Sequence, residues 1–130
     1  MIVDSSAIVA ILQFESDTRE LAEAIQEATE RRISVVSYVE TAMVLDSRRN
    51  PALSRRLDDF LREAQVLLEP VTIEQARIAR EAYREYGKGH HRARLNFGDC
   101  FAYALAKDKG EPLLFKGEDF RKTDVEVAEY

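Results

Sequence analysis

The chain has little of what several familiar protein classes require. Its 130 residues include one cysteine, no tryptophan, three prolines and five glycines. A single cysteine excludes an internal disulfide and is typical of a protein from a reducing cytoplasm. No apolar run approaches the roughly 20 residues that cross a bilayer, and the opening residues have no basic segment or cleavage site of a secretion signal. We therefore expect a cytoplasmic protein with no membrane partner.

Positive charge is also scarce, except in one segment. The chain has 19 lysines and arginines against 24 acids, a net charge of -5, which argues against indiscriminate nucleic-acid binding by the whole surface. The exception lies between Gly87 and Gly98, where five basic or imidazole side chains occur without an acid: Lys88, His90, His91, Arg92 and Arg94. Taken alone, this segment is explained by a solvated surface turn. Beside an acidic site, the segment would attract a polyanion that the acids repel. His90 and His91 are adjacent, so they do not form a metal-binding pair with i,i+4 spacing.

The apolar pattern predicts a single α/β domain over residues 1–130. Short apolar runs at 1–3, 33–36, 66–69 and 113–115 predict strands, and residues 125–127 are a candidate edge strand. Helical periodicity occupies the intervals between them. Strands that alternate with helices predict a mostly parallel sheet covered by helices on both faces.

Carboxylates recur where these strands end and helices begin. Asp4 closes the first apolar run, Glu40 follows the second, Asp99 opens an apolar helix, and Asp119 follows the last run. The carboxyl ends of parallel strands converge on one crevice. Carboxylates gathered there repel one another unless a hard divalent cation joins them, so the pattern predicts a Mg²⁺ or Mn²⁺ site.

Each acid also has an ordinary structural explanation. Asp4 suits a helix N-cap, Glu40 suits the second half of a capping box with Ser37, and Asp99 suits the first turn of a helix. The combination favours the metal site, because Asp4 ends a strand expected to be central and buried, and no lysine or arginine lies near Asp99 in its segment.

Cys100 is expected to be a buried, inert thiol, since neighbouring acids raise a thiol pKa.

Four stretches of the chain resemble the PIN-domain ribonucleases, and among them the VapC toxins of bacterial toxin–antitoxin pairs. They are residues 1–7 (MIVDSSA), 37–40 (SYVE), 86–100 (YGKGHHRARLNFGDC) and 112–124 (PLLFKGEDFRKTD). The resemblance implies a PIN-like three-layer sandwich and a Mg²⁺- or Mn²⁺-dependent endoribonuclease. It also implies an RNA substrate, a homodimer and a cognate antitoxin that holds the enzyme inactive.

The same resemblance assigns roles to individual residues. Asp4, Glu40, Asp99 and Asp119 are the expected catalytic metal-binding acids, with Glu118 and Asp124 as alternatives for the fourth. Ser6, or less favourably Ser5, would hydrogen-bond an acid and orient it, and Asn96 matches the family's asparagine before the third acid. Lys88, Arg92 and Arg94 are the expected RNA contacts.

Two other function classes would place an aspartate at a strand end or keep such a fold. A phosphotransfer or receiver-type domain is disfavoured because Ser6 occupies the place of the second acid in the pattern Asp-x-Asp-x-Thr. A non-catalytic RNA- or protein-binding module is disfavoured because all four acids are present.

Overall fold

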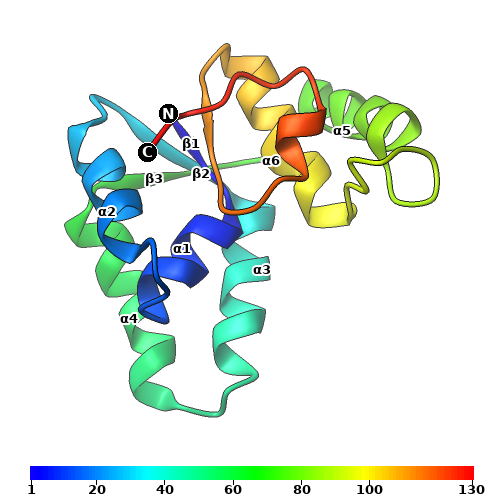
Figure 1. The fold of residues 1–130 in the computed structure, drawn as a ribbon. Coiled ribbons are helices and arrows are strands. Elements are labelled where there is room, and N and C mark those ends of the chain that lie inside the picture. The colour runs from blue at the N-terminus through cyan, green and yellow to red at the C-terminus, as the bar shows by residue number, and fades with distance from the viewer.

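The computed structural model describes all residues from 1 to 130. Helices surround a small sheet (Figure 1). The elements follow the order β1 (Ile2–Val3), α1 (Ser5–Leu12), α2 (Thr18–Glu27), β2 (Arg31–Ser34), α3 (Val35–Asp46), α4 (Pro51–Glu63), β3 (Val66–Glu69), α5 (Ile73–Tyr86), α6 (Phe97–Lys109), β4 (Leu113–Leu114) and the 3₁₀ turn η1 (Phe120–Lys122). No helix is long and apolar enough to cross a membrane.

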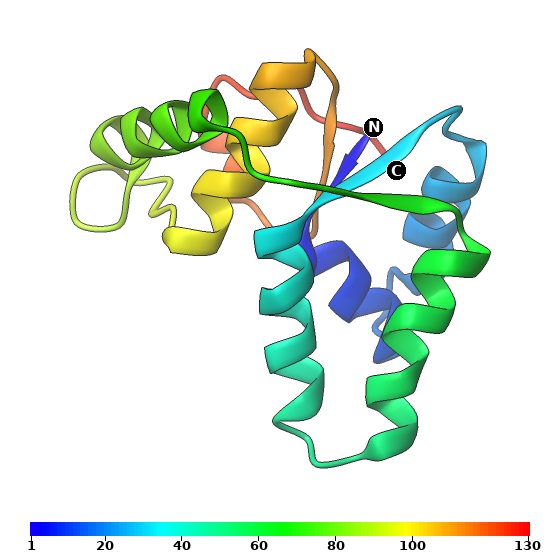
Figure 2. The ribbon, with the colours of Figure 1, turned by 180° about the vertical axis from the view of Figure 1, so that it is seen from behind.

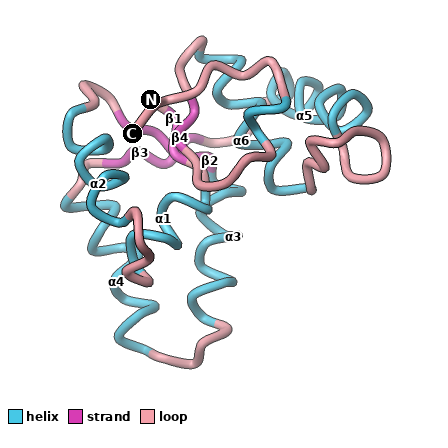
Figure 3. The backbone as a smooth tube through the Cα atoms, in the orientation of Figure 1, coloured by secondary structure: helices cyan, strands magenta, loops and turns pink.

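The sheet is entirely parallel, with the strand order β3-β2-β1-β4 (Figure 3). Ile2 pairs with Arg32 on one side and Leu113 on the other, so β1 is a central strand. The candidate edge strand at residues 125–127 is reduced to one parallel bridge between Leu113 and Val127. Because all four strands run the same way, their carboxyl ends share one edge of the sheet.

Two hydrophobic cores lie on opposite faces of this sheet. Side chains alternate between the two faces of a strand. Ile2 and Leu113 therefore pack with α5 and α6, and Val3 and Leu114 pack with α1 to α4. All four side chains are fully buried. Figures 1 and 2 show the sheet between these two helical layers, which confirms the three-layer α/β architecture.

A network of charges surrounds Arg32 of β2. The Arg32 guanidinium donates to Glu69 at 2.7 Å, Glu30 at 2.5 Å and Glu111 at 3.0 Å. The N-terminal ammonium also contacts Glu111, at 2.7 Å. Each acid of this network therefore faces a cation.

The predicted capping box of α3 is wrong. The second strand begins two residues earlier than expected and ends at Ser34, whose hydroxyl accepts a hydrogen bond from Val36 N at 3.2 Å and caps the helix. Ser37 lies inside the helix, fully buried, and its hydroxyl oxygen has no hydrogen-bond partner. Glu40 is therefore not needed to complete a cap.

Alanine variants of Ser34, the observed cap of α3, and Ser37, the predicted cap, should differ in stability. Ser34→Ala removes the observed cap and should lower the free energy of unfolding by about 0.5–2 kcal/mol. Ser37→Ala removes a buried hydroxyl without a partner, so it should leave stability unchanged or raise it slightly. Urea denaturation of both variants measures the difference, and a larger loss for Ser37→Ala would contradict the observed cap.

Candidate metal and catalytic site

Asp4 lies at the carboxyl end of the central strand β1 and is 2% exposed. It caps α1, and its Oδ2 accepts hydrogen bonds from Ser6 N at 3.0 Å and Ser6 Oγ at 2.6 Å. Its other oxygen, Oδ1, is buried and has no hydrogen-bond partner. Burial raises the pKa of Asp4 to about 6, and the charge of Glu40 adds to that effect. A buried carboxylate oxygen without a donor is suited to a cation.

Glu40 reaches the site from the second turn of α3. Its Oε1 accepts a hydrogen bond from Ser5 Oγ at 2.5 Å, which ties α3 to the start of α1. Its carboxylate also lies against the backbone of Gly98 in α6, where an added Cβ would stand 1.9 Å from Glu40 Oε2. Any larger residue at position 98 would push this carboxylate away.

Asp99 enters from the first turn of α6 through a capping box with Asn96. The Asn96 side chain accepts from Asp99 N at 2.8 Å, and the Asp99 side chain accepts from Asn96 N at 3.0 Å. Burial raises the pKa of Asp99 to about 7, and the charges of Asp4, Glu40 and Asp119 raise it further. The capping role suggested by the sequence is real, yet it leaves Asp99 facing the other three acids.

The structure separates the three candidates for the fourth acid. Asp124 accepts a hydrogen bond from Tyr103 at 2.5 Å and another from Lys107 at 3.1 Å, which holds it against α6. Asp119 is exposed at the start of η1, and its charge acts on Asp99. Glu118 is exposed beside it but is not among the charges that raise the pKa of Asp99. The arrangement therefore favours Asp119.

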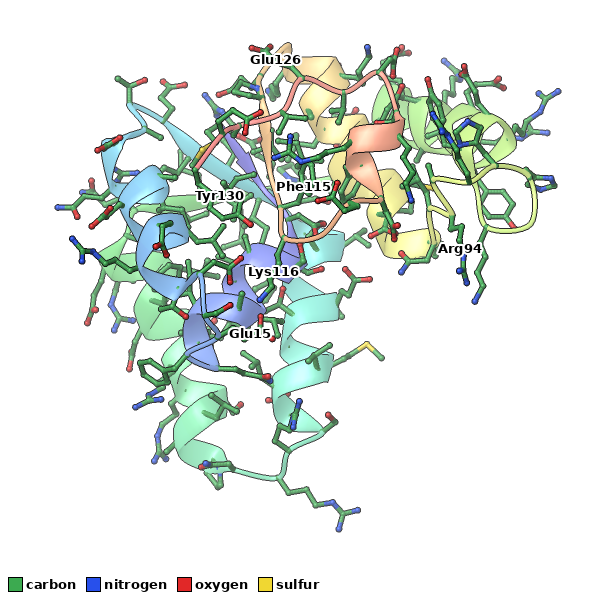
Figure 4. All side chains as sticks on the ribbon, viewed as in Figure 1. Glu15, Arg94, Phe115, Lys116, Glu126 and Tyr130 are labelled. Carbon is green, nitrogen blue, oxygen red and sulfur yellow. The ribbon has the colours of Figure 1, made fainter.

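The loop that carries Asp119 is held close to Asp4. Lys116 N donates to Ser6 Oγ at 3.0 Å, and the same Ser6 hydroxyl donates to Asp4. The Lys116 ammonium contacts Glu15 and Asp17, each at 2.9 Å, and Figure 4 shows Lys116 and Glu15 pointing toward one another. Ser6 thus links the first acid to the segment of the fourth.

The four acids have no counter-charge within the chain, since none of Asp4, Glu40, Asp99 and Asp119 forms an ion pair with lysine or arginine. No three acidic, imidazole or thiol groups come together as a finished metal shell. Three of the carboxylates instead use one oxygen to accept a local hydrogen bond. Oxygen donors, excess negative charge and the unpartnered Asp4 Oδ1 fit a hard divalent cation.

The basic segment forms a closed loop at the far end of α5. Lys88 N donates to Leu95 O at 2.9 Å and Leu95 N donates to Tyr86 O at 3.0 Å, which closes the base of the loop. Lys88, Arg92 and Arg94 are exposed, and Figure 4 shows Arg94 well separated from Lys116. The loop therefore flanks the acids without joining them.

Cys100 lies directly after Asp99 and is 3% exposed. Burial, and then the charge of Asp99, raises the pKa of its thiol to about 11. The expected burial of Cys100 is confirmed, and a raised pKa is consistent with a thiol that stays protonated near neutral pH.

Gly98 and Ser5 help to position Glu40, and the sequence patterns did not predict this role. Gly98 matters because Glu40 lies against its backbone, and Ser5 matters because it donates to Glu40. A glycine within the first turn of an apolar helix is a visible signal of close approach. Nothing in the sequence names Glu40 as the group that approaches.

Comparison with known proteins places this fold and site in a family. The model of the PIN domain matches residues 1–126. Ribonuclease VapC28 of Mycobacterium tuberculosis is 54% identical over 129 residues, which cover 98% of this chain and 97% of the relative. Ribonuclease VapC of Mycolicibacterium smegmatis is 54% identical over 125 residues, which cover 96% of this chain and 97% of the relative. The chain belongs to the PIN-domain family, among the VapC ribonucleases, and the resemblance read from its motifs is confirmed.

Solved structures agree with the fold. VapC20 of M. tuberculosis, described as a toxin that cleaves the sarcin–ricin loop, has a TM-score of 0.74 at 20% identity and covers 98% of each chain. A chain of a toxin–antitoxin complex from Klebsiella pneumoniae has a TM-score of 0.75 at 15% identity, covering 99% of this chain and 97% of that one. At these identities the likeness is one of fold.

The raised pKa values of Asp4 and Asp99 predict how stability depends on pH without metal. In the folded protein these acids hold protons to about pH 6 and 7, whereas their ordinary value is 3.8. The folded state therefore binds more protons than the unfolded state between pH 4 and 7, and stability should fall as pH rises through that window.

Denaturation in a chelator at about pH 4.5 and pH 8 measures this slope. Asp4→Asn or Asp99→Asn should flatten the slope and raise stability at pH 8 by an amount on the order of 1–3 kcal/mol, because each removes a desolvated charge. A parent protein that gains stability from pH 5 to pH 7, with no gain from either variant, would contradict the mutual repulsion of the acids.

Proposed function

We propose that this protein is a metal-dependent endoribonuclease and the toxin of a toxin–antitoxin pair. The observation that carries the proposal is a set of four acids without a counter-cation, in which the charges of three raise the pKa of Asp99 and Asp4 has a buried, unpartnered oxygen. The names of the VapC relatives support the choice of RNA as substrate.

Asp4, Glu40, Asp99 and Asp119 would hold the cation, Mg²⁺ or Mn²⁺. When bound, such an ion lowers the pKa of a coordinated water and stabilises the charge that develops on the scissile phosphate. The oxygen chemistry of all four side chains suits these hard cations rather than a thiol- or imidazole-binding metal.

The neighbours of these acids would hold them ready for the ion. Ser6 fixes one oxygen of Asp4, Ser5 fixes one oxygen of Glu40, and Asn96 fixes one oxygen of Asp99. Each contact orients a carboxylate and leaves its second oxygen for a ligand. Such supporting hydrogen bonds are worth about 10- to 100-fold in metal affinity or activity.

Lys88, Arg92 and Arg94 would contact the RNA backbone. The acids attract the cation but repel phosphate, so cationic side chains near them are needed to offset that repulsion. Arginine is suited to bidentate phosphate contacts. The loop is closed at its base, so these exposed side chains extend from a defined frame.

The protein would act in the cytoplasm as a homodimer held inactive by a cognate antitoxin. The fold it shares with a chain of a toxin–antitoxin complex supports a protein partner. An apolar groove of about 640 Å³ between α3 and the start of α6 includes Glu40 in its lining, and Val39 and Met43 are 52% and 68% exposed there. We place an antitoxin segment in this groove, with a basic side chain directed at the acids.

The carboxylates can be tested by isosteric replacement. Asp4→Asn, Asp99→Asn and Glu40→Gln should each reduce cleavage of total bacterial RNA in Mg²⁺ or Mn²⁺ by at least about 100-fold, since the loss of a supporting contact alone costs 10- to 100-fold. The Glu40→Gln result is informative because Ser34, and not Glu40, caps α3.

Asp119→Asn and Asp124→Asn form a matched pair for the fourth position. Asp119→Asn should reduce cleavage, whereas Asp124→Asn should lower stability through the lost contacts with Tyr103 and Lys107 and leave cleavage of the folded fraction intact. If Asp4→Asn or Asp99→Asn cleaves RNA at the parent rate, the proposed catalytic role of these acids is wrong.

The loop can be tested by salt dependence. In an Asp4→Asn background, replacing Lys88, Arg92 and Arg94 by alanine should weaken RNA binding and lower the slope of log affinity against log salt by roughly 0.7 per lost contact to single-stranded RNA. Mn²⁺ affinity, measured by calorimetry in the parent background, should not fall. An unchanged salt slope would mean that the RNA backbone does not cross this loop.

A further inference from the structure

A large hollow of the molecule lies outside the group of acids. It is a cleft of about 770 Å³ between α5 and α6, next to the base of the basic loop. Figures 1 and 2 both show these helices side by side, joined by the loop that ends at Asn96. The volume is in the range of about 300–1,000 Å³ usual for ligand sites. Of the residues that hydrogen-bond the acids, only Asn96 lines this cleft.

One wall of the cleft is cationic. Arg80 and Arg84 stand one helical turn apart on α5, and Lys88 continues the same spacing just beyond the helix. Arg80 and Lys88 form no ion pair, and Arg84 contacts only the exposed Glu81 at 3.0 Å. Three cations along one cleft are notable in a chain whose net charge is -5. They form a track for a polyanion.

Three aromatic side chains contribute to the remaining lining. Phe97 and Phe101 are one turn apart on α6, with their rings 5.0 Å apart edge to face, and Tyr83 joins from α5. Phe97 is 72% exposed and so is accessible to a ligand, whereas the Tyr83 ring, 43% exposed, also packs edge to face with His90 at 5.2 Å. Cations along a groove together with accessible aromatic rings are the combination that binds single-stranded nucleic acids, through phosphate contacts and base stacking.

The cleft borders the acids through one residue. Asn96 lines it, and the Asn96 side chain accepts the hydrogen bond from Asp99 N. A strand whose phosphate lay at the acids could therefore pass Asn96 into the cleft. The basic loop's Arg92 and Arg94 do not line the cleft, so this surface is distinct from theirs.

We propose that the α5–α6 cleft is a subsite for unpaired nucleotides of the RNA substrate beside the scissile phosphate. Arg80 and Arg84 would contact the phosphates, and Phe97 would stack on a base. The proposal rests on the proposed ribonuclease function and adds a position for the substrate strand. Stacking tolerates every base, so the subsite would favour single-stranded over paired RNA rather than read a sequence.

The test is RNA binding in the uncleaving Asp4→Asn background, with a fluorescent random-sequence 20-nucleotide RNA at several salt concentrations. Arg80→Ala with Arg84→Ala should lower the log–log salt slope by about 1.4, at roughly 0.7 per phosphate contact to a single strand. Phe97→Ala should weaken binding about 5- to 150-fold at an unchanged slope. The same RNA annealed into a duplex should be affected little by Phe97→Ala.

The control is a pair of exposed arginines that do not line the cleft, Arg55→Ala with Arg77→Ala, which changes the net charge equally. The control pair should leave the slope near that of the parent. An equal drop in both pairs would reduce the effect to overall charge and overturn the subsite. Unchanged RNA binding by Phe97→Ala, with a shift in mass from dimer to monomer, would also overturn it and assign the cleft to a protein interface.

Cleavage measured alongside distinguishes this subsite from the function on which it rests. If the parent protein cleaves RNA, and cleft variants that retain Asp4 bind and cleave RNA as the parent does, the subsite is wrong and the ribonuclease function stands. A parent that fails to cleave RNA in Mg²⁺ or Mn²⁺, while its cleft variants lose binding, would sink the catalytic proposal and leave the subsite standing.

Discussion

The burial of the Asp4 carboxylate is the constraint on which the rest of the site depends. Asp4 follows the central strand of the sheet, where α1 and the β4 loop cover it, and burial raises its pKa to about 6. One oxygen is satisfied by Ser6, whose hydroxyl also accepts from the Lys116 backbone, and the other has no partner. A buried acid in this state is costly, because desolvation opposes its charge. The cost is offset when a cation binds, so the fold itself favours a metal at this edge.

Two groups of acids have opposite surroundings. Around Arg32, the carboxylates of Glu30, Glu69 and Glu111 each contact the guanidinium, so these ion pairs serve stability. Asp4, Glu40, Asp99 and Asp119 have no ion pair with lysine or arginine, and the charges of the other three raise the pKa of Asp99. Parallel topology contributes to this second group, because every strand delivers its following loop or helix to the same edge of the sheet. The repulsion expected in the metal-free protein is thus the counterpart of the proposed cation binding.

The first turn of α6 is where the proposed roles meet. Asn96 accepts a hydrogen bond from Asp99 N and lines the α5–α6 cleft. The absence of a side chain at Gly98 leaves room for the Glu40 carboxylate. The apolar groove on the α3 side includes the same turn. A protein segment in that groove and an RNA strand in the cleft would therefore approach the same acids from two sides. Inhibition by a partner would then need no distant conformational change.

Much of the fold was readable from the sequence because its signals are local. Apolar runs marked the strands, and the acids at the strand ends pointed to one crevice. Thr72 caps α5 and Pro51 opens α4, places typical of these residue types. Other features depended on tertiary contacts. Whether Ser34 or Ser37 caps α3 was decided by where β2 leaves the sheet, and Glu40 meets Gly98 across 58 positions of sequence. Asp124 is withdrawn from the acids by Tyr103, 21 residues away. Residue type and spacing determine which local structures are favourable, but which remote side chains touch is decided only when the helices pack on the sheet.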